Sequence, residues 1–360
     1  MNMERIYVVF FMVKQFRWKS LASVIILMII GLVSCLPVHM ETEIPLQSLS
    51  ISEQGTLIQE QTSSISFSSP SIIDTTQYTV QERMILINEG FGEPLKQNLW
   101  IALIRDIDPY QKVTKSVINP GDYRLVTDEN GNQFAEFDFS KMAPGSEIEV
   151  RLDYEISVNS LTYDLSQCVG ELPDFFTSAE LHIESLNPQI VDLAEKLSAG
   201  RQSACEQSRA FYDFIGDDLV YSYNGEDWGA QAALGPMGAD CTEYASLMMA
   251  LSRASGIPAR YLEGLYYNPR NGSNLARTEH AWFEVYLPGI GWTPMDPTLG
   301  RTSITREDYF AKMTPDHIIV SRGRNPSVLR GSSYFTHIYW PGDSTAIIVK
   351  EFEWKILKIE

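Results

Sequence analysis

The fold of this chain is decided by the segment from Asp240 to Arg260, which reads DCTEYASLMMALSRASGIPAR. Its apolar residues recur at helical spacing, and Gly256-Ile257-Pro258 near its end is a combination that stops helices. Asp240 and Glu243 have the spacing of a capping box, in which two side chains bond the free backbone N–H groups at a helix start. We therefore expect a helix whose first turn contains Cys241.

The helix start alone does not make Cys241 a nucleophile. The positive end of a helix stabilises an anion by roughly 0.3–1 kcal/mol, whereas a tenfold change in the thiolate fraction takes about 1.4 kcal/mol. Asp240 and Glu243 also oppose a negative charge on the sulfur. Cys241 therefore needs an imidazolium partner, and without one the pattern indicates a core cysteine packed with Tyr244 and Leu247.

Two later segments contain residues that complete such a site. His280 lies in EHAWFEVYL, whose alternation is typical of a strand, on the side that also carries Trp282 and Glu284. Pro288-Gly289-Ile290-Gly291 then turns the chain, and an antiparallel return strand brings Asp296 within a residue or two of His280. A thiol, an imidazole and a carboxylate in this order are the parts of a cysteine acyl-transfer site.

The residues around these three groups form a pattern made of five stretches: Gly238-Ala239-Asp240-Cys241, Tyr244-Ala245, Leu251 to Arg260, His280-Ala281-Trp282 and Asp296-Pro297-Thr298. This pattern resembles the transglutaminase-like superfamily, whose fold is related to that of the papain-like cysteine proteases, over about residues 187–300. The resemblance implies that Cys241 is the nucleophile, His280 the general base and acid, and Asp296 the orienting residue. Asp240 departs from the family, which often has a small residue or a tryptophan-type context before the cysteine.

Acyl transfer also needs at least two hydrogen-bond donors for the oxyanion of the tetrahedral intermediate. The Cys241 backbone N–H offers one, and Trp228 or Gln231 in the preceding loop offers the second. Trp228 is equally consistent with a residue that lines the substrate cleft or packs. No cofactor is expected, because the sequence has neither a phosphate loop nor a dinucleotide fingerprint. No metal is expected either, since three further histidines lack metal-ligand spacing: His182, His317 and His337.

The N-terminal residues 1–35 have the pattern of an export signal. Basic residues precede an apolar run from Leu21 to Val33, and Leu32-Val33-Ser34-Cys35 resembles the bacterial lipobox, in which the cysteine (Cys35) is lipidated. A signal-anchor helix is the alternative, because Leu21 to Val38 has about the 18-residue length of a membrane span. Both alternatives place the following chain outside the cytoplasm and tethered to the cell membrane. Residues 36–76, rich in Ser, Thr and Gln, are typical of a stalk.

The rest of the chain divides by its periodicity. The pattern has period two from about Gln77 to Val158, and Asn130-Gly131 between two runs is a strong hairpin signal, so we expect an immunoglobulin-like β-sandwich over residues 77–180. In residues 187–300 helical patterns come first and strand patterns follow. They predict an α+β domain with helices packed on an antiparallel sheet, and the resemblance implies that this domain is papain-like and transglutaminase-like. Residues 301–360 are expected to complete that domain.

Composition limits the partners. The sequence has 28 Lys and Arg against 46 Asp and Glu, a net charge of −18 that argues against nucleic acid. Cys168 and Cys205 either form a disulfide in an oxidising compartment or remain two buried thiols. We expect a protein or peptide substrate, with cell-surface and cell-wall peptides among the candidates. The alternatives are a binding or scaffold lipoprotein that keeps the fold without activity, and a structural surface protein with a buried Cys241.

Overall fold

The computed structural model describes residues 69–223, 229–236, 238–269, 278–325, 328, 337–340 and 347–359. They belong to one compact unit, Thr62–Glu360. Among these described residues, no helix is long and apolar enough to cross a membrane. The predicted export signal with Cys35, the predicted stalk up to residue 68 and the candidate oxyanion donor Trp228 lie outside the described residues.

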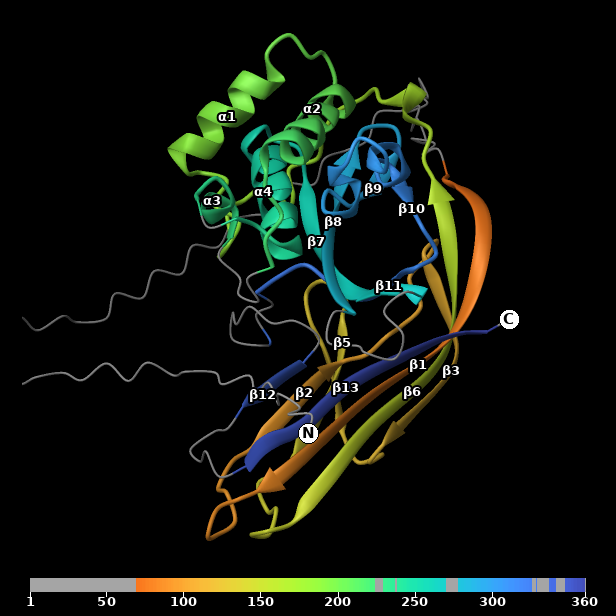
Figure 1. Ribbon diagram of the computed structural model, residues 1–360, viewed down its shortest axis with the longest axis vertical. Coiled ribbons are helices and arrows are strands. Elements are labelled where there is room, and N and C mark those ends of the chain that lie inside the picture. The colour runs from red at the N-terminus through yellow and green to blue at the C-terminus, as the bar shows by residue number, and fades with distance from the viewer. Residues whose placement is uncertain are drawn as a thin grey trace, which may run out of the picture. The chain divides into compact units, whose positions relative to one another are not determined.

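One half of the unit is a four-stranded antiparallel sheet that carries helices (Figure 1). The strand order is β11-β7-β8-β9, and every neighbouring pair is antiparallel. Helix α4 packs on β7 and β8, while α1, α2 and α3 pack on α4. This half has the α+β architecture that the sequence predicts. Its elements are α1 (Pro188–Ser198), α2 (Ala204–Asp218), α3 (Gly229–Ala233), α4 (Cys241–Ala254), β7 (Ala259–Tyr266), β8 (Glu279–Leu287), β9 (Gly291–Met295) and β11 (His317–Arg322).

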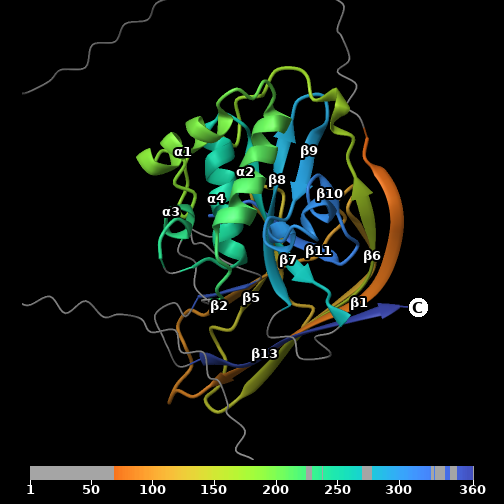
Figure 2. The ribbon, with the colours of Figure 1, turned by 45° about the horizontal axis from the view of Figure 1, so that its top comes forward.

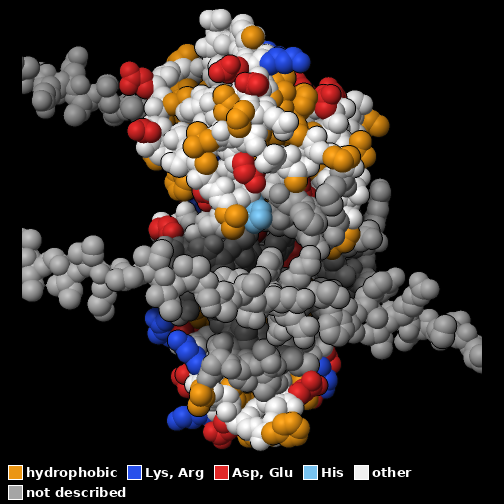
Figure 3. Space-filling view, turned by 90° about the vertical axis from the view of Figure 1, so that its left-hand side faces the viewer, with side chains coloured by type: hydrophobic (Ala, Val, Ile, Leu, Met, Phe, Trp, Pro, Cys, Tyr) orange, Lys and Arg blue, Asp and Glu red, His pale blue; other side chains and the backbone are white. Residues whose placement is uncertain are grey.

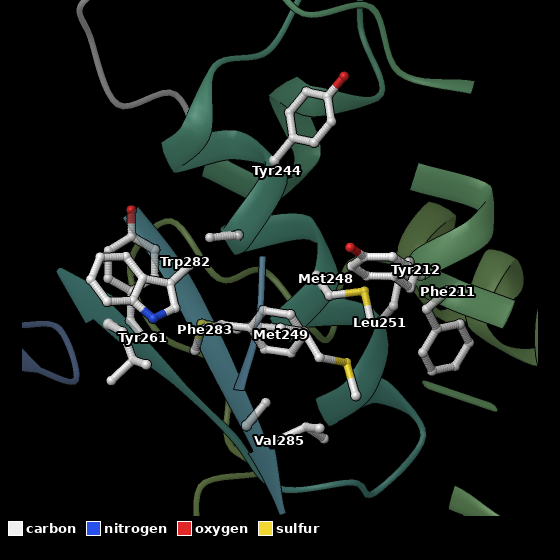
Figure 4. Packing of buried hydrophobic residues seen from close by; sticks show 14 of the residues in the cluster. Phe211, Tyr212, Tyr244, Met248, Met249, Leu251, Tyr261, Trp282, Phe283 and Val285 are labelled. Atoms are coloured by element: carbon white, nitrogen blue, oxygen red, sulfur yellow. The ribbon is translucent and has the colours of Figure 1, made fainter. Parts of the chain in front are cut away.

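Helix α4 is the centre of this half, because nearly all of its side chains are buried. Every residue from Thr242 to Arg253 is buried, which accounts for apolar residues on more than one face of the helix. Figure 4 shows Met248, Met249 and Leu251 lying between side chains of β8 and side chains of α2. This packing holds α4 against the sheet and thereby fixes its first residue, Cys241.

The other half of the unit consists of two sheets, with strand orders β10-β6-β1-β13 and β12-β2-β5-β4; β3 also pairs with β6. Side chains of both sheets form one hydrophobic cluster that includes Tyr78, Phe137, Leu152 and Trp354. Two sheets that share a core form a β-sandwich, and its immunoglobulin-like character stays a prediction. Figure 2 shows β8 and β9 between the helices and the long strands β1 and β6. The strands are β1 (Ser71–Asn88), β2 (Asn98–Ala102), β3 (Gln111–Asn119), β4 (Arg124–Thr127), β5 (Gln133–Asp138), β6 (Glu147–Thr162), β10 (Lys312–Met313), β12 (His337–Trp340) and β13 (Ile347–Ile359).

The C-terminal region divides between the two halves, contrary to the expectation that residues 301–360 complete the α+β domain. Strand β11 joins the α+β sheet beside β7. Strand β12, however, pairs with β2, and β13 pairs with β1 from Gln77 to Asn88. Alternation along β13 gives it a buried face with Trp354 and Ile356, but alternation does not specify which sheet edge a strand joins. The sandwich therefore contains strands from both sides of the α+β core, beyond residues 77–180.

Buried polar contacts link the two halves. Tyr110 Oη, just before β3, donates to Glu284 Oε2 of β8 at 2.9 Å. Gln111 Nε2 donates to the carbonyl of Ile319 in β11 at 2.8 Å, and Gln111 Oε1 accepts from the Ile319 N–H at 2.8 Å. Because these groups are buried, each contact replaces water that folding removes from a polar atom. The sandwich therefore supports the antiparallel sheet through β8 and β11.

A disulfide fixes the junction between the halves. Cys168 and Cys205 are bonded, with their Cα atoms 6.2 Å apart and 37 residues of sequence separation. The bond joins the segment after β6 to the first turn of α2. Of the two alternatives that the sequence leaves open for these cysteines, the structure has the disulfide.

Candidate active site

Cys241 is the first residue of α4, and its thiol is partly exposed and free. The predicted capping box is present: Asp240 Oδ1 accepts from the Thr242 N–H at 3.1 Å, and Glu243 Oε2 accepts from the Asp240 N–H at 3.0 Å. The Thr242 hydroxyl also lies 2.9 Å from Asp240 Oδ1. The carboxylates of Asp240 and Glu243, whose charges disfavour a thiolate, thus both accept hydrogen bonds from the backbone at the start of α4 and hold it in place.

His280 of β8 meets Asp296 at the end of β9. Phe283 pairs with Met295 across these antiparallel strands, so the next position along β9 falls beside Trp282, two residues from His280. His280 Nε2 lies 2.7 Å from Asp296 Oδ2. The antiparallel return that the sequence predicts for this carboxylate is confirmed.

The same imidazole also reaches the thiol. Cys241 interacts with the His280 side chain and raises the pKa of the imidazole. Because Asp296 lies at Nε2, Nδ1 is the ring nitrogen available to the thiol. The ring thereby connects the start of α4 to the end of β9. The structure brings together the three side chains that the sequence selects.

Charge in this cluster favours a protonated imidazole beside the thiol. Burial lowers the pKa of His280, but the charge of Asp296 and the hydrogen bonds to Asp296 and Cys241 outweigh burial and raise it to about 10. Burial raises the pKa of Asp296, yet its contacts with His280 and His317 hold that pKa below its usual range. At neutral pH the site therefore contains an imidazolium and a carboxylate. The imidazolium is the positively charged partner that a Cys241 thiolate needs, because the helix dipole alone stabilises the thiolate too weakly.

A second histidine, His317 of β11, completes the surroundings of Asp296. Its Nε2 lies 3.0 Å from Asp296 Oδ2, the oxygen that also contacts His280. The other carboxylate oxygen, Oδ1, accepts the N–H groups of Thr298 and Leu299, both at 2.9 Å. Both oxygens of Asp296 thus have two partners, which suits a buried carboxylate.

The contact of His317 with Asp296 could not be predicted from the sequence, because it depends on a distant strand pairing. The residue follows Asp296 by 21 positions and reaches it only through the pairing of β11 with β7. The available signal was a histidine at the start of an otherwise apolar strand, HIIV, since a buried imidazole needs polar partners.

His280, Asp296 and His317 also have the residue types of a metal site. One ligand atom from each lies within 4.8 Å of the others, and Zn²⁺ binds such donors. Both Nε2 atoms, however, lie at hydrogen-bond distance from Oδ2, 2.7 and 3.0 Å. Metal binding would require both nitrogens without protons, so this arrangement fits hydrogen bonding better. The expected absence of a catalytic metal stays a prediction.

Aromatic rings enclose the imidazole. Trp282 stacks on His280 with ring centroids 5.7 Å apart and planes at 21°, and Tyr266 lies 5.8 Å from the His280 ring. These rings exclude water from the pair of His280 and Asp296, which strengthens its electrostatic interaction. On the open side, the chain at Tyr221 bridges to Ala239, next to the α4 cap.

Of the predicted oxyanion donors, Cys241 and Gln231 lie within the described residues. Cys241 is the first residue of α4, so its backbone N–H has no acceptor within the helix. Gln231 lies exposed on α3, and its backbone N–H already donates to Glu184 Oε2 at 3.1 Å. Its side chain as the second donor stays a prediction. Arg253 and Arg260 form ion pairs with Glu180 and Glu284.

A cysteine at a helix start, a histidine on an antiparallel strand and an aspartate just after the next strand are the residue types and order of a cysteine acyl-transfer site. Residues 191–297 match the model of the transglutaminase-like superfamily, and the chain thus contains a transglutaminase-like domain. A candidate cysteine protease from Cytophaga hutchinsonii has a similar fold, with a TM-score of 0.58 and 14% identity over 81% of this chain and 93% of that chain.

Two curated relatives match shorter stretches. An uncharacterized protein, YebA of Bacillus subtilis (strain 168), is 27% identical over 198 residues, 48% of this chain and 27% of the relative. A protein-glutamine gamma-glutamyltransferase of Pseudomonas aeruginosa is 40% identical over 63 residues, 16% of this chain and 9% of the relative. This chain therefore spans about a quarter or less of the length of these two relatives.

Proposed function

We propose that this chain is a cysteine enzyme that cleaves or exchanges amide bonds through an acyl-enzyme on Cys241. The observation that carries the proposal is the set of Cys241, His280 and Asp296, in which Asp296 lies 2.7 Å from the imidazole and Cys241 interacts with the same ring. Such a set supplies a nucleophile, an acid–base group and an orienting carboxylate.

In the first half-reaction the Cys241 thiolate attacks the carbonyl carbon of the amide. The carbonyl oxygen becomes an oxyanion, which the Cys241 N–H stabilises. The C–N bond then breaks while the His280 imidazolium gives its Nδ1 proton to the leaving amine. The product is a thioester on Cys241 and a free amine.

In the second half-reaction water or an amine attacks the thioester. His280 Nδ1, now unprotonated, accepts the proton of the attacking group, and the C–S bond breaks to restore the cysteine. Asp296 holds the imidazole throughout, because its hydrogen bond to Nε2 directs Nδ1 towards the sulfur. Hydrolysis is the simpler outcome, since water is always present and an amine acceptor requires its own binding site.

The proposed substrate is a protein or peptide, including peptides of the cell surface or cell wall. Exposed residues beside the α4 cap, Val220, Tyr221 and Tyr223, offer an apolar wall for an extended chain. Acidic and apolar side chains gather over the helical half in Figure 3, while basic ones are sparse there. This surface agrees with the net charge of −18 and disfavours nucleic acid as a partner.

The proposed location is the outer side of a cell membrane. The disulfide Cys168–Cys205 supports an oxidising compartment. The membrane tether, through lipidated Cys35 or a signal anchor, rests on the sequence pattern of residues 1–35.

Capture of the acyl-enzyme tests the activity. The full chain is incubated with a pool of glutamine-containing peptides and hydroxylamine, which converts the thioester to a hydroxamate. We expect a hydroxamate product and an acyl mass on the Cys241 peptide, with both absent in Cys241→Ser and strongly reduced in His280→Ala. Equal product from the parent and from Cys241→Ser would exclude this mechanism. Absence of any product and of an acyl mass favours the alternative, a binding or scaffold lipoprotein without activity.

A further inference from the structure

The site holds a second imidazole that the proposed mechanism does not use. His317 opens β11, opposite Tyr266 of β7, and its side chain has no exposed surface (0%). Its Nε2 lies 3.0 Å from the Asp296 oxygen that contacts His280. We propose that His317 is a positioning residue: it holds Asp296 in the orientation in which the carboxylate accepts a hydrogen bond from His280. This inference rests on the proposed function.

Two polar contacts hold the His317 ring. An ionised Asp296 can only accept hydrogen bonds, so His317 Nε2 donates. On the other side of the ring, Nδ1 lies 3.0 Å from Thr314 Oγ1, a hydroxyl that can donate or accept there. Thr314 thus holds the ring in the orientation that points Nε2 at Asp296.

This donor controls the freedom of the carboxylate. The N–H groups of Thr298 and Leu299 hold Oδ1, but they leave Oδ2 free to tilt. With His317 present, Oδ2 receives two hydrogen bonds and keeps one direction. With His317 removed, Oδ2 tilts and the alignment of His280 with the thiol loosens. The interaction with His280 that favours a thiolate on Cys241 then weakens.

Other titratable groups around the cluster are the same in every variant considered. Burial raises the pKa of each neighbouring tyrosine, so these tyrosines stay uncharged at neutral pH. A change in the formation of the Cys241 thiolate therefore measures the effect that His317 has on the thiol through Asp296 and His280. The groups that face the cluster are Cys241 of α4, Tyr212 of α2, Tyr266 of β7, and Tyr309 and Asp316 of the segments before and after β10.

Alkylation by iodoacetamide measures this link without a substrate, because the thiolate sulfur displaces iodide while a thiol hardly reacts. The full chain is labelled across a pH series, and the Cys241 peptide is quantified by mass spectrometry. His317→Phe fills the ring space without a donor, and His317→Gln restores an N–H near Nε2. We expect the labelling midpoint to rise by about one pH unit in His317→Phe, a tenfold loss of thiolate or about 1.4 kcal/mol. His317→Gln should recover most of this loss.

Controls separate this role from a general loss of packing. Ile318, the next residue of β11, belongs to the sandwich core, so Ile318→Val weakens the packing of β11 without touching Asp296 and should leave the midpoint unchanged. Equal shifts in Ile318→Val and His317→Phe would overturn the proposal. An unchanged midpoint in His317→Phe, together with a shifted midpoint in His280→Ala, would also overturn the proposal. The proposed function would not be affected by that result. If neither histidine substitution moves the midpoint, the proposed function itself fails.

A second variant covers the case in which His317→Phe does not fold. Thr314→Val removes only the hydroxyl that holds the His317 ring at Nδ1. We expect a smaller rise of the midpoint than for His317→Phe. A midpoint identical to that of the parent would overturn the role assigned to His317.

Discussion

His280 Nε2 lies 2.7 Å from Asp296 Oδ2 in a place where the two side chains are only 9% and 2% exposed. A surface pair of this kind contributes little to stability. In a buried pair, by contrast, removal of one partner leaves an uncompensated charge and costs about 3–5 kcal/mol. The contact is therefore expected to affect both the reactivity of Cys241 and the stability of the fold.

Asp296→Asn tests the effect on reactivity. The substitution keeps the shape of the side chain, removes the charge that raises the pKa of His280, and presents an amide donor or a neutral acceptor to Nε2. We expect labelling of Cys241 at mildly acidic pH to fall about tenfold or more, and turnover to fall by up to about 10⁴-fold, because the ring loses its tautomer and charge. Labelling rates and hydroxamate formation measure the two effects, and parent-like values in both would contradict the role of Asp296.

Stability should depend on pH through the same pair. The pKa of His280 is raised from 6.5 to about 10 in the folded protein, so its contribution is complete below about pH 6.5 and is lost as the pH rises towards about 10. The pKa of Asp296 is depressed, so its contribution is present above about pH 3.8 and is lost as the pH falls below that value.

Urea unfolding of the parent and of His280→Gln checks this dependence. The difference in unfolding free energy between the two proteins should be largest near about pH 5–6 and should shrink by at least about 1 kcal/mol near about pH 9.5. Other alkaline titrations cancel in the comparison, because both proteins contain them. A difference that is the same at both pH values would show that the pair does not titrate as the structure implies.

Much of the site could be predicted because its parts are local in sequence. The capping box spans Asp240 to Glu243, and His280 and Asp296 lie on neighbouring strands joined by a short turn. Short-range periodicity and turn residues specify such elements. The thiol, imidazole and carboxylate could therefore be selected before any contact between them was known.

The remainder depends on pairings between distant segments. His317 reaches Asp296 only because β11 pairs with β7, and β13 joins β1 although most of the chain separates them. An alternating pattern determines which face of a strand is buried, but leaves the neighbouring strand undetermined. The same limit applies to Glu284: alternation along β8 does not specify that the sandwich half covers this residue, yet it is fully buried there.

Asp240→Asn tests whether the cap weakens the nucleophile. Asparagine is a good N-cap, so the substitution should preserve α4 while it removes a negative charge next to Cys241. An elementary charge at a helix start changes the energy of a nearby anion by roughly 0.3–1 kcal/mol, and we expect labelling at mildly acidic pH to increase by about two- to fivefold. Asp240→Ala is the matched control, with a loss of about 1 kcal/mol in unfolding free energy. Slower labelling in Asp240→Asn would mean that Asp240 assists the thiolate.

Glu284 should couple the unfolding of the sandwich to that of the transglutaminase-like core. Its carboxylate accepts from Tyr110 Oη at 2.9 Å and pairs with Arg260 and Arg322. Glu284→Ala leaves two guanidinium groups without their buried partner, so we expect a loss of about 3–5 kcal/mol. Tyr110→Phe removes one neutral donor to a charged acceptor and should cost about 1.5–3 kcal/mol of unfolding free energy.

Urea unfolding followed by both fluorescence and circular dichroism measures these losses. Two separate transitions in the parent would show that the halves do not unfold together, whereas a single transition in the parent that splits in Glu284→Ala would identify this carboxylate as the link.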